Sequence, residues 1–369
     1  MAFRASFSES RKNPIFYVFE MNEKKILIIG GGPAGLEAAY QLAQNGCSVH
    51  LLEKEAEVGG NLKKYATLFP DFSDASEVRK ALTDRMIHKN IELETGVCVS
   101  ELVAEGEKWI AKSDSGKQHS GDAVLLTTGF ETFDPSRKEE LGYGIYDNVV
   151  TSVEFENMLK TGKVRTAAGN MPERIAFLSC IGSRDEKVGN HYCSRVCCIN
   201  AVKLSIGFKK LQPEAEAYFF YMDMRMAGQC YEELYRKSQE EYGIMYIRGR
   251  VSEAAATMDN RIQIKSEDTL LGLPLKLTVD LLVLMVGIES SPSTRLLAAQ
   301  NGIKGDYGFA QSLNVQKSDN LTKKQGLFLA GTCKRPLTLQ ETLADARAAA
   351  LQMLNYLRET VTEGNTAGN

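Results

Sequence analysis

Four cysteines are the residues of this sequence with the clearest capacity for chemistry. Cys180, Cys193, Cys197 and Cys198 follow the spacing C-x12-C-x3-C-C, within the segments SCIGSRD and HYCSRVCC. If the second segment is helical, Cys193 and Cys197 lie one turn apart on the same side, and Cys198 lies on the neighbouring ridge. Cys180 would approach from the end of an apolar strand opposite. The spacing therefore predicts that four thiolates converge on one site.

Several kinds of site are compatible with this spacing. Zinc is usually bound by C-x2–4-C pairs, so the adjacent Cys197 and Cys198 are awkward zinc ligands. A [4Fe–4S] cluster has separate iron corners, so adjacent cysteines can bind different irons. A redox-active thiol pair and buried structural cysteines also stay open. The other cysteines have no partner at ligand spacing and are expected to be structural: Cys47, Cys98, Cys230 and Cys333.

The second chemical signal is a glycine-rich turn. Gly30, Gly32 and Gly35 match G-x-G-x-x-G between an apolar strand expected at 25–29 and a helix expected at 33–44. In this motif the first glycine allows a tight turn, the second lets the backbone approach a pyrophosphate, and the third lets the helix pack on the strand. The helix N-terminus adds free N–H groups and partial positive charge. The turn therefore predicts a dinucleotide site.

An acidic residue supports the same prediction. Glu53 ends the next expected strand at 48–53, 18 residues after Gly35, where a carboxylate can accept hydrogen bonds from a ribose diol. These elements form a βαβ unit, which is the start of a doubly wound α/β sheet. Further strands are expected at 122–129, 281–287 and 326–331, and further helices at 74–89, 293–301 and 338–358.

The layout resembles two-dinucleotide-binding-domain flavoproteins of the thioredoxin-reductase type, over roughly residues 22–168 and 278–360. The resemblance rests on the glycine turn together with VGGNL at 58–62, LLTTGF at 125–130 and FLAGT at 328–332. It implies that the first site holds FAD. The residues expected to bind it are Gly30, Gly32, Pro33, Ala34, Gly35, Glu53, Lys54, Gly60, Asn61, Val99, Thr128, Gly129, Gly331, Thr332 and Thr338.

Two features of the last third bear on this resemblance. Thr338 and Glu341 form a capping-box sequence at the start of the last helix. If the resemblance holds, the dipole of that helix stabilises negative charge on the reduced flavin. The family has an acid in the late glycine turn, and Thr332 replaces it here, so that contact must be made differently.

The second nucleotide fingerprint is missing from this chain. A pyridine-nucleotide-dependent flavoprotein needs a second G-x-G-x-x-G, and its place is after the apolar strand at 174–180. CIGSRD stands there, with one glycine, and a Cβ would hold a pyrophosphate away from the backbone. Cys180 ends the same strand. We therefore expect that a hydride-donor site has become a metal site.

The region around the cysteines resembles the A subunit of heterodisulfide reductase. The likeness covers about residues 22–358 and is most specific in CIGSRDEKVGNHYCSRVCCINAVKLS, MDMRMAG at 222–228 and YGIMYIRGRVSE at 242–253. The chain is also similar to the A-like subunits of sulfur oxidisers and to the A subunit of quinone-interacting oxidoreductases. The resemblance implies a [4Fe–4S] cluster where the pyridine nucleotide would lie, bound by Cys180, Cys193, Cys197 and Cys198. It also puts Lys203 beside the isoalloxazine ring as a catalytic residue, whereas a solvated helix lysine is the alternative.

The chain departs from the large methanogen-type members of this family. It has no C-x2-C-x2-C ferredoxin runs, so we expect a core-only member. The expected organisation has a flexible extension at 1–21, a discontinuous FAD-binding domain at 22–168 and 278–361, an inserted NAD-domain-like iron–sulfur domain at 169–277, and a tail at 362–369.

Composition excludes several classes of function. The 369 residues are 43% hydrophobic and 25% charged, with a net charge of −3, so no basic surface for nucleic acid is indicated. The longest apolar runs are too short to cross a bilayer, so membrane association is expected only through partners. Clustered cysteines without a secretory signal indicate a reducing cytoplasm. The four histidines are scattered along the sequence and show no acid–base arrangement: His50, His88, His119 and His191.

These observations predict an FAD-dependent oxidoreductase subunit that transfers electrons between flavin and a [4Fe–4S] cluster. The expected partners are heterodisulfide-reductase B- and C-like iron–sulfur subunits, and a homodimer through the second domain is compatible with the sequence. Two other functions are kept open. One is a stand-alone NAD(P)H-dependent flavin disulfide reductase, against which the lost second fingerprint argues. The other is a zinc-stabilised FAD-binding assembly subunit.

Overall fold

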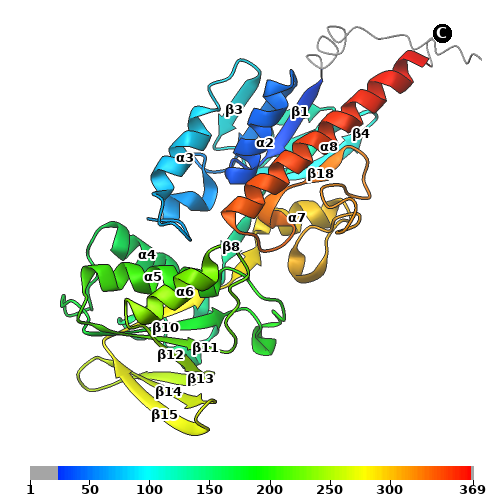
Figure 1. The fold of residues 1–369 in the computed structure, drawn as a ribbon. Helices are drawn as coiled ribbons and strands as arrows, with labels where there is room; N and C mark the ends of the chain where they lie inside the picture. The colour runs from blue at the N-terminus through cyan, green and yellow to red at the C-terminus, as the bar shows by residue number, and fades with distance from the viewer. Residues whose placement is uncertain (1–23, 367–369) are drawn as a thin grey trace, which may run out of the picture.

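The computed structural model describes residues 24–366 and shows two lobes placed end to end (Figure 1). The expected extension at 1–21 and the last residues of the expected tail lie outside the described residues. The two lobes follow the same plan, in which a parallel sheet has helices on one face and a three-stranded antiparallel meander on the other. The expected α/β class with two doubly wound units is confirmed.

The first lobe is built on a parallel sheet in the order β18-β7-β1-β2-β3. Ile26 and Ile28 of β1 pack toward the helices, and Leu27 and Ile29 pack toward the meander, so both faces of the sheet are buried. This two-sided burial explains why the strand is apolar at nearly every position. The strands of this lobe are β1 (Lys25–Ile29), β2 (Ser48–Glu53), β3 (Ile91–Thr95), β7 (Ala123–Leu126) and β18 (Leu327–Leu329), with the meander β4 (Val99–Glu105), β5 (Lys108–Ser113) and β6 (Gln118–Gly121).

The second lobe repeats this arrangement in the order β12-β11-β10-β16-β9. Ile175 and Phe177 of β10 pack toward helices, and Ala176 and Leu178 pack toward the second meander. Its strands are β9 (Val149–Thr151), β10 (Arg174–Ile181), β11 (Glu216–Tyr221), β12 (Met245–Arg248) and β16 (Leu281–Val286), with the meander β13 (Val251–Ala256), β14 (Ile262–Asp268) and β15 (Leu273–Val279).

The chain crosses between the lobes through a pair of short antiparallel strands, β8 (Phe130–Thr132) and β17 (Ile288–Ser290). β9 and β16 both pair within the second sheet. The sheet pairing therefore favours domain boundaries near these two strands, instead of the expected boundaries near residues 168 and 278. The physical reason is that a strand belongs to the sheet that satisfies its backbone hydrogen bonds.

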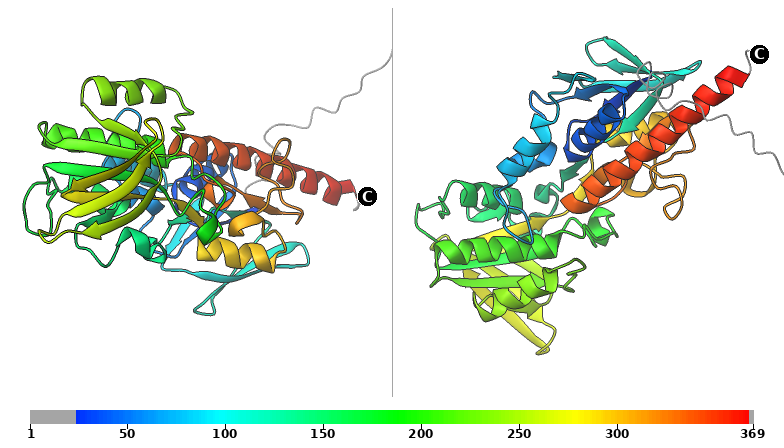
Figure 2. Two further views of the ribbon diagram at one scale, coloured as in Figure 1. Left: turned by 90° about the horizontal axis from the view of Figure 1, so that it is seen from below. Right: turned by 45° about the horizontal axis from the view of Figure 1, so that its top comes forward.

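The helices lie close to the positions expected from the sequence, and α8 is longer than expected. It continues to Thr366, past residue 361, and runs along the first lobe (Figure 2). The helices are α2 (Pro33–Gln44), α3 (Ala75–Asp84), α4 (Ser152–Lys160), α5 (Cys197–Leu211), α6 (Tyr231–Glu240), α7 (Pro292–Gln300) and α8 (Leu339–Thr366). None of the helices in the described part of the chain combines the length and the apolar character that crossing a bilayer requires.

Candidate functional site

One pocket of about 550 Å³ joins the glycine turn of the first lobe to the cysteine region of the second. The residues predicted to bind FAD line it, except Gly35 and Gly331, which pack behind its wall. Cys197 and Lys203 line the same pocket. A pocket that starts at a dinucleotide turn and reaches a cysteine-bearing helix has room for an extended ligand between the two sites.

The three motif glycines are required for different physical reasons. A Cβ on Gly35 would lie 2.0 Å from the carbonyl oxygen of Gly30, so the third glycine is needed for packing of the helix on the strand. A Cβ on Gly32 would meet nothing within 4 Å and would project into open space beside the pocket. That open space at the N-terminus of α2 is where a pyrophosphate would approach the backbone. The residues of this turn fit a dinucleotide.

Glu53 connects the end of β2 to the glycine turn. Its Oε2 atom accepts a hydrogen bond of 2.5 Å from the backbone N–H of Gly31, and its Oε1 atom accepts one of 2.8 Å from Glu55. The side chain is buried and also lines the pocket. A carboxylate held in this way is oriented by the protein backbone and keeps lone pairs free for a ribose hydroxyl.

The late glycine turn uses an acid that the sequence pattern did not indicate. Asp345, on α8, accepts a hydrogen bond of 2.6 Å from the N–H of Gly331. Its other oxygen lies 2.7 Å from Nζ of Lys334, which also contacts Asp319 at 2.8 Å. Thr332 lines the pocket without a carboxylate, so Asp345 binds the turn from behind. No local sequence pattern links a helix residue to a turn 14 positions earlier.

The N-terminus of α8 opens into the same pocket. The capping box is confirmed, because Glu341 accepts a 2.8 Å hydrogen bond from the N–H of Thr338 and its own N–H donates to the hydroxyl of Thr338 at 3.2 Å. Thr338, Leu339 and Gln340 line the pocket. The partial positive charge of this helix end is therefore directed at whatever the pocket binds.

The four cysteines come from three local structures. Cys180 lies near the carboxyl end of β10 with a φ of 63°, Cys197 and Cys198 open α5, and Cys193 lies in the loop before it. The expectation that a helical turn joins Cys193 to Cys197 was wrong. Arg195, between them, adopts a φ of 63°, which is left-handed and cannot continue a right-handed helix.

The thiols lie close enough to interact in every pair. Burial is the main cause that raises the pKa of Cys197 well above its ordinary value, and the charges of the other three thiolates raise it further. Burial also raises the pKa of Cys198 to about 11, again with contributions from Cys180 and Cys193. The pKa of Cys180 is raised by burial and by Cys193. Four such thiolates need a cationic centre to coexist.

The spacing of the sulfur atoms favours a large centre. Within residues 24–366, no three of these cysteines bring their sulfur atoms within 4.8 Å of one another. A tetrahedral zinc ion with Zn–S of about 2.3 Å holds its sulfur ligands about 3.8 Å apart. A [4Fe–4S] cluster carries each ligand on a separate iron, so it suits a wider spacing.

Two buried donors follow Cys180 in the chain without a partner. The hydroxyl of Ser183 and Nη1 of Arg184 make no hydrogen bond to any described residue. The Arg184 guanidinium is near Cys180 and Cys193, and its other terminal nitrogen donates to Asp223 at 2.6 Å. Unpaired buried donors are costly unless something accepts from them. An anionic centre held by the cysteines fits this requirement.

Lys203 lines the pocket with its three ammonium protons already engaged. Its Nζ lies 2.9 and 2.7 Å from the two carboxylate oxygens of Glu156 and 2.8 Å from the carbonyl oxygen of Thr67. Both side chains are almost fully buried. Burial lowers the pKa of Lys203, and the charge of Glu156 opposes this effect. Lys203 therefore anchors a first-lobe loop to α4 and α5, which is a role that the sequence did not indicate.

Comparisons with known proteins agree with this geometry. A family model described as pyridine nucleotide-disulphide oxidoreductase matches residues 24–154. The A-type iron-sulfur subunit of the CoB–CoM heterodisulfide reductase of Methanocaldococcus jannaschii is 31% identical, over 89% of this chain and 63% of that protein. The A subunit of the H2/formate:CoB–CoM heterodisulfide, ferredoxin reductase of Methanococcus maripaludis is 30% identical, with the same coverage. The chain thus spans less than two thirds of the length of these relatives.

Solved structures give the fold. The thioredoxin reductase of Lactococcus lactis has a TM-score of 0.65 and 16% identity, covering 91% of this chain and 100% of that one. The thioredoxin reductase of T. acidophilum has a TM-score of 0.63 and 19% identity, covering 90% and 99%. By its sequence the chain belongs to the family of heterodisulfide reductase A subunits, and it has a thioredoxin-reductase-like fold.

Proposed function

We propose that this chain binds FAD and a [4Fe–4S] cluster and transfers electrons between them as the A subunit of a heterodisulfide-reductase-like oxidoreductase complex. The observation that carries the proposal is the continuity of one pocket from Gly32 to Cys197, where the second nucleotide fingerprint is missing. When bound, FAD supplies two-electron chemistry and the cluster supplies one-electron transfer.

The chain's own residues have separate tasks in this proposal. The free N–H groups at the start of α2, beside Gly32, bind the pyrophosphate, and Glu53 binds the ribose. The N-terminus of α8 stabilises negative charge at the other end of the pocket. Cys180, Cys193, Cys197 and Cys198 are the proposed cluster ligands. Placed near two of them, Arg184 offsets negative charge, which is one of the levers that set a reduction potential.

The proposed partners are iron–sulfur subunits of the heterodisulfide reductase B and C type. The two methanogen relatives are subunits of such complexes, which supports an assembly with further chains. Leu270, Leu271 and Leu273 are between 59% and 70% exposed at the turn that joins β14 to β15. Neighbouring exposed leucines support a protein contact at the far end of the second lobe, with a partner chain of the complex or with a second copy of this chain.

The proposal is tested by anaerobic purification followed by flavin, iron and sulfide assays and by electron paramagnetic resonance of the dithionite-reduced protein. We expect one FAD per chain, about four iron and four sulfide, and a signal of a reduced cubane cluster. Zinc without iron or sulfide would replace the proposal with a zinc-stabilised assembly subunit. Rapid bleaching of the flavin by NADH or NADPH, without partners, would indicate a stand-alone disulfide reductase instead.

A further inference from the structure

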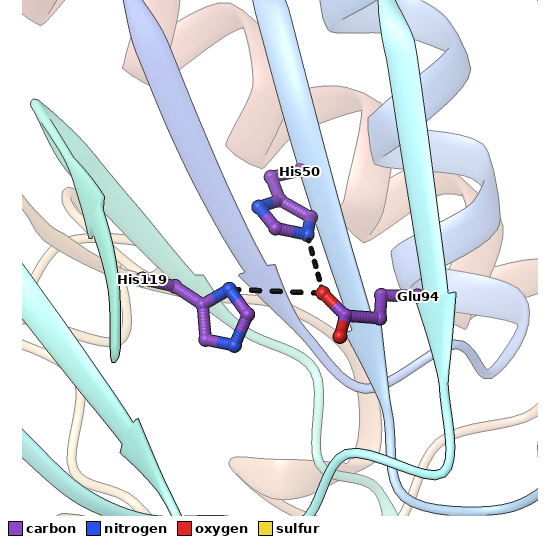
Figure 3. Close-up of side chains that lie close together, drawn as sticks. All are labelled: His50, Glu94 and His119. Atoms are coloured by element: carbon purple, nitrogen blue, oxygen red, sulfur yellow. Dashed lines mark hydrogen bonds and ion pairs between the residues drawn. The ribbon is translucent and has the colours of Figure 1, made fainter. Parts of the chain in front are cut away.

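Two histidines and a glutamate that are far apart in the sequence meet inside the first lobe, away from the pocket. His50 lies on β2, Glu94 on β3 and His119 on β6 of the meander, and one ligand atom from each lies within 4.8 Å of the others (Figure 3). Within the described residues this is the only such group of three metal-ligating side chains. The histidines were expected to be scattered, and two of the four are not.

The distances around Glu94 suit a small cation. Its Oε2 atom lies 3.2 Å from Nε2 of His50 and 3.8 Å from Nδ1 of His119. Zinc binds nitrogen and oxygen at about 2.0–2.2 Å, so tetrahedral ligand atoms are about 3.3 Å apart. The first distance already fits this spacing. The second reaches it after the His119 ring moves by about half an ångström.

Burial and hydrogen bonding leave the two imidazoles ready to bind a metal. The side chains of His50 and His119 are 4% and 2% exposed, and burial lowers the pKa of each, so both rings are neutral. Nδ1 of His50 and Nε2 of His119 have no hydrogen-bond partner among the described residues. Two neutral rings that share one carboxylate oxygen leave most of their polar capacity unused, which is costly for buried groups.

The surroundings resemble the outer shell of a metal site. Glu92, which pairs with His50 in the β2–β3 register, places a carboxylate oxygen 3.7 Å from Nδ1 of His50. A carboxylate behind a ligating histidine holds the ring and raises its basicity. On the other side, Nζ of Lys117 lies 2.5 Å from Oε1 of Glu94. This ammonium group occupies the carboxylate in the way that a metal would, and it competes with one.

We propose that His50, Glu94 and His119 form a binding site for a divalent transition-metal ion of the Zn²⁺ class, with water as the fourth ligand. Two imidazoles and a carboxylate, with one open position, are a common zinc ligand set. The ion joins β2 and β3 to the meander strand β6. Glu53 ends β2, and Val97 to Val99, which follow β3, line the pocket, so the ion stiffens the strands that form the pocket wall.

The test uses the full chain, purified anaerobically with its flavin and cluster, and one equivalent of Zn²⁺. X-ray absorption at the zinc edge separates the two places where zinc can bind, because cysteine ligands give sulfur neighbours and this site gives only nitrogen and oxygen. We expect retained zinc with a nitrogen and oxygen shell that includes imidazole. Sulfur neighbours, or no zinc retained after gel filtration, would overturn the proposal.

Substitutions make the assignment specific. Glu94→Gln and His119→Gln should each abolish zinc retention, while His88→Gln, which changes a histidine outside the site, should leave it unchanged. Lys117→Met removes the competing ammonium group and should tighten binding, whereas Glu92→Gln should weaken it about ten-fold. If His119→Gln fails to fold, the two changes at Glu92 and Lys117 still decide. Equal affinity in both would contradict the site.

Discussion

Arg195 and Glu341 form an ion pair of 2.6 Å that joins the loop carrying Cys193 to the first turn of α8. Arg195 also donates to the carbonyl oxygen of Pro336 at 3.3 Å, and its backbone N–H donates to Sγ of Cys193 at 3.3 Å. Glu341 is at the same time the acid of the α8 capping box. One side chain therefore connects the cysteine loop with the helix end that opens into the pocket.

Two substitutions at Glu341 separate the ion pair from the cap. Glu341→Gln keeps a capping-box acceptor and removes the charge, and because both partners are about two fifths exposed we expect a loss of at most ~1 kcal/mol. Glu341→Ala removes both, and should cost about 1 kcal/mol more. Urea unfolding measures both. Equal losses in the two variants would show that Glu341 does not act as a cap.

The cysteine assignment predicts a selective spectral change. Cys197→Ala should abolish the broad cluster absorbance and leave FAD bound, because Cys197 is a proposed ligand and FAD depends on the other end of the pocket. Cys230→Ala, at an exposed cysteine, is the matched control and should change neither. Anaerobic absorbance spectra and iron analysis test this. A full cluster spectrum in Cys197→Ala would count against the ligand set.

The glycine turn predicts opposite failures for two neighbouring substitutions. Gly32→Val places its side chain in open space, so the chain should fold with an unchanged thermal midpoint in the absence of flavin, and FAD should be released. Gly35→Val would press against the backbone at Gly30 and should prevent stable folding. Flavin content and thermal unfolding distinguish the two. Stoichiometric FAD in Gly32→Val would refute the assignment of the turn as a dinucleotide site.

Local patterns predicted the parts of the site that are local. The glycine turn, the acid at the end of β2 and the capping box each occupy a few consecutive residues, so their geometry follows from chain direction and turn chemistry. The grouping of the cysteines was predicted, but the helix between Cys193 and Cys197 was not found. The left-handed conformation of Arg195 ends it, and no residue preference announces such a conformation at an arginine.

Long-range polar pairs could not be predicted from the sequence. Glu156 and Lys203 are 47 residues apart and meet only after α4 and α5 pack together. His50 and His119 come from different sheets, and their approach depends on how the meander crosses the parallel strands. Strand periodicity shows which residues face inward, but it does not show which inward residues meet.

The buried ionic group behind the late glycine turn predicts acid sensitivity. Burial alone would raise the pKa of Asp319, but hydrogen bonds from Arg335 and Lys334 outweigh this and hold that pKa well below its usual value. A carboxylate with a depressed pKa adds stability above the unfolded pKa, near about 3.9, and this stability is lost as pH falls toward the folded pKa.

Asp319→Asn should therefore cost about 3 kcal/mol at pH 7, because it leaves the buried ammonium group of Lys334 with a single carboxylate. The difference between the variant and the unchanged protein should shrink below about pH 4. Urea unfolding at pH 7, 5 and 3.5 tests this, with Asp114→Asn as an exposed control. A difference that stays constant down to pH 3.5 would contradict the ionic role of Asp319.

The buried pair of Lys203 and Glu156 allows a structural role to be separated from a role in flavin chemistry. Lys203→Met leaves an uncompensated carboxylate in the interior and should cost about 3–5 kcal/mol. Adding Glu156→Gln removes that charge and keeps an acceptor for the N–H of Ala66, which donates to Glu156 at 2.9 Å, so most of the loss should be recovered.

The recovered double variant then tests the catalytic assignment of Lys203. A positive charge near the isoalloxazine ring favours the reduced, anionic flavin, so its removal should lower the flavin midpoint potential in a redox titration. Neutralising the pair leaves the net charge unchanged, so a shift would report the position of the ammonium group relative to the ring. An unchanged potential in the folded double variant would leave Lys203 as an anchor between the lobes and remove it from the catalytic residues.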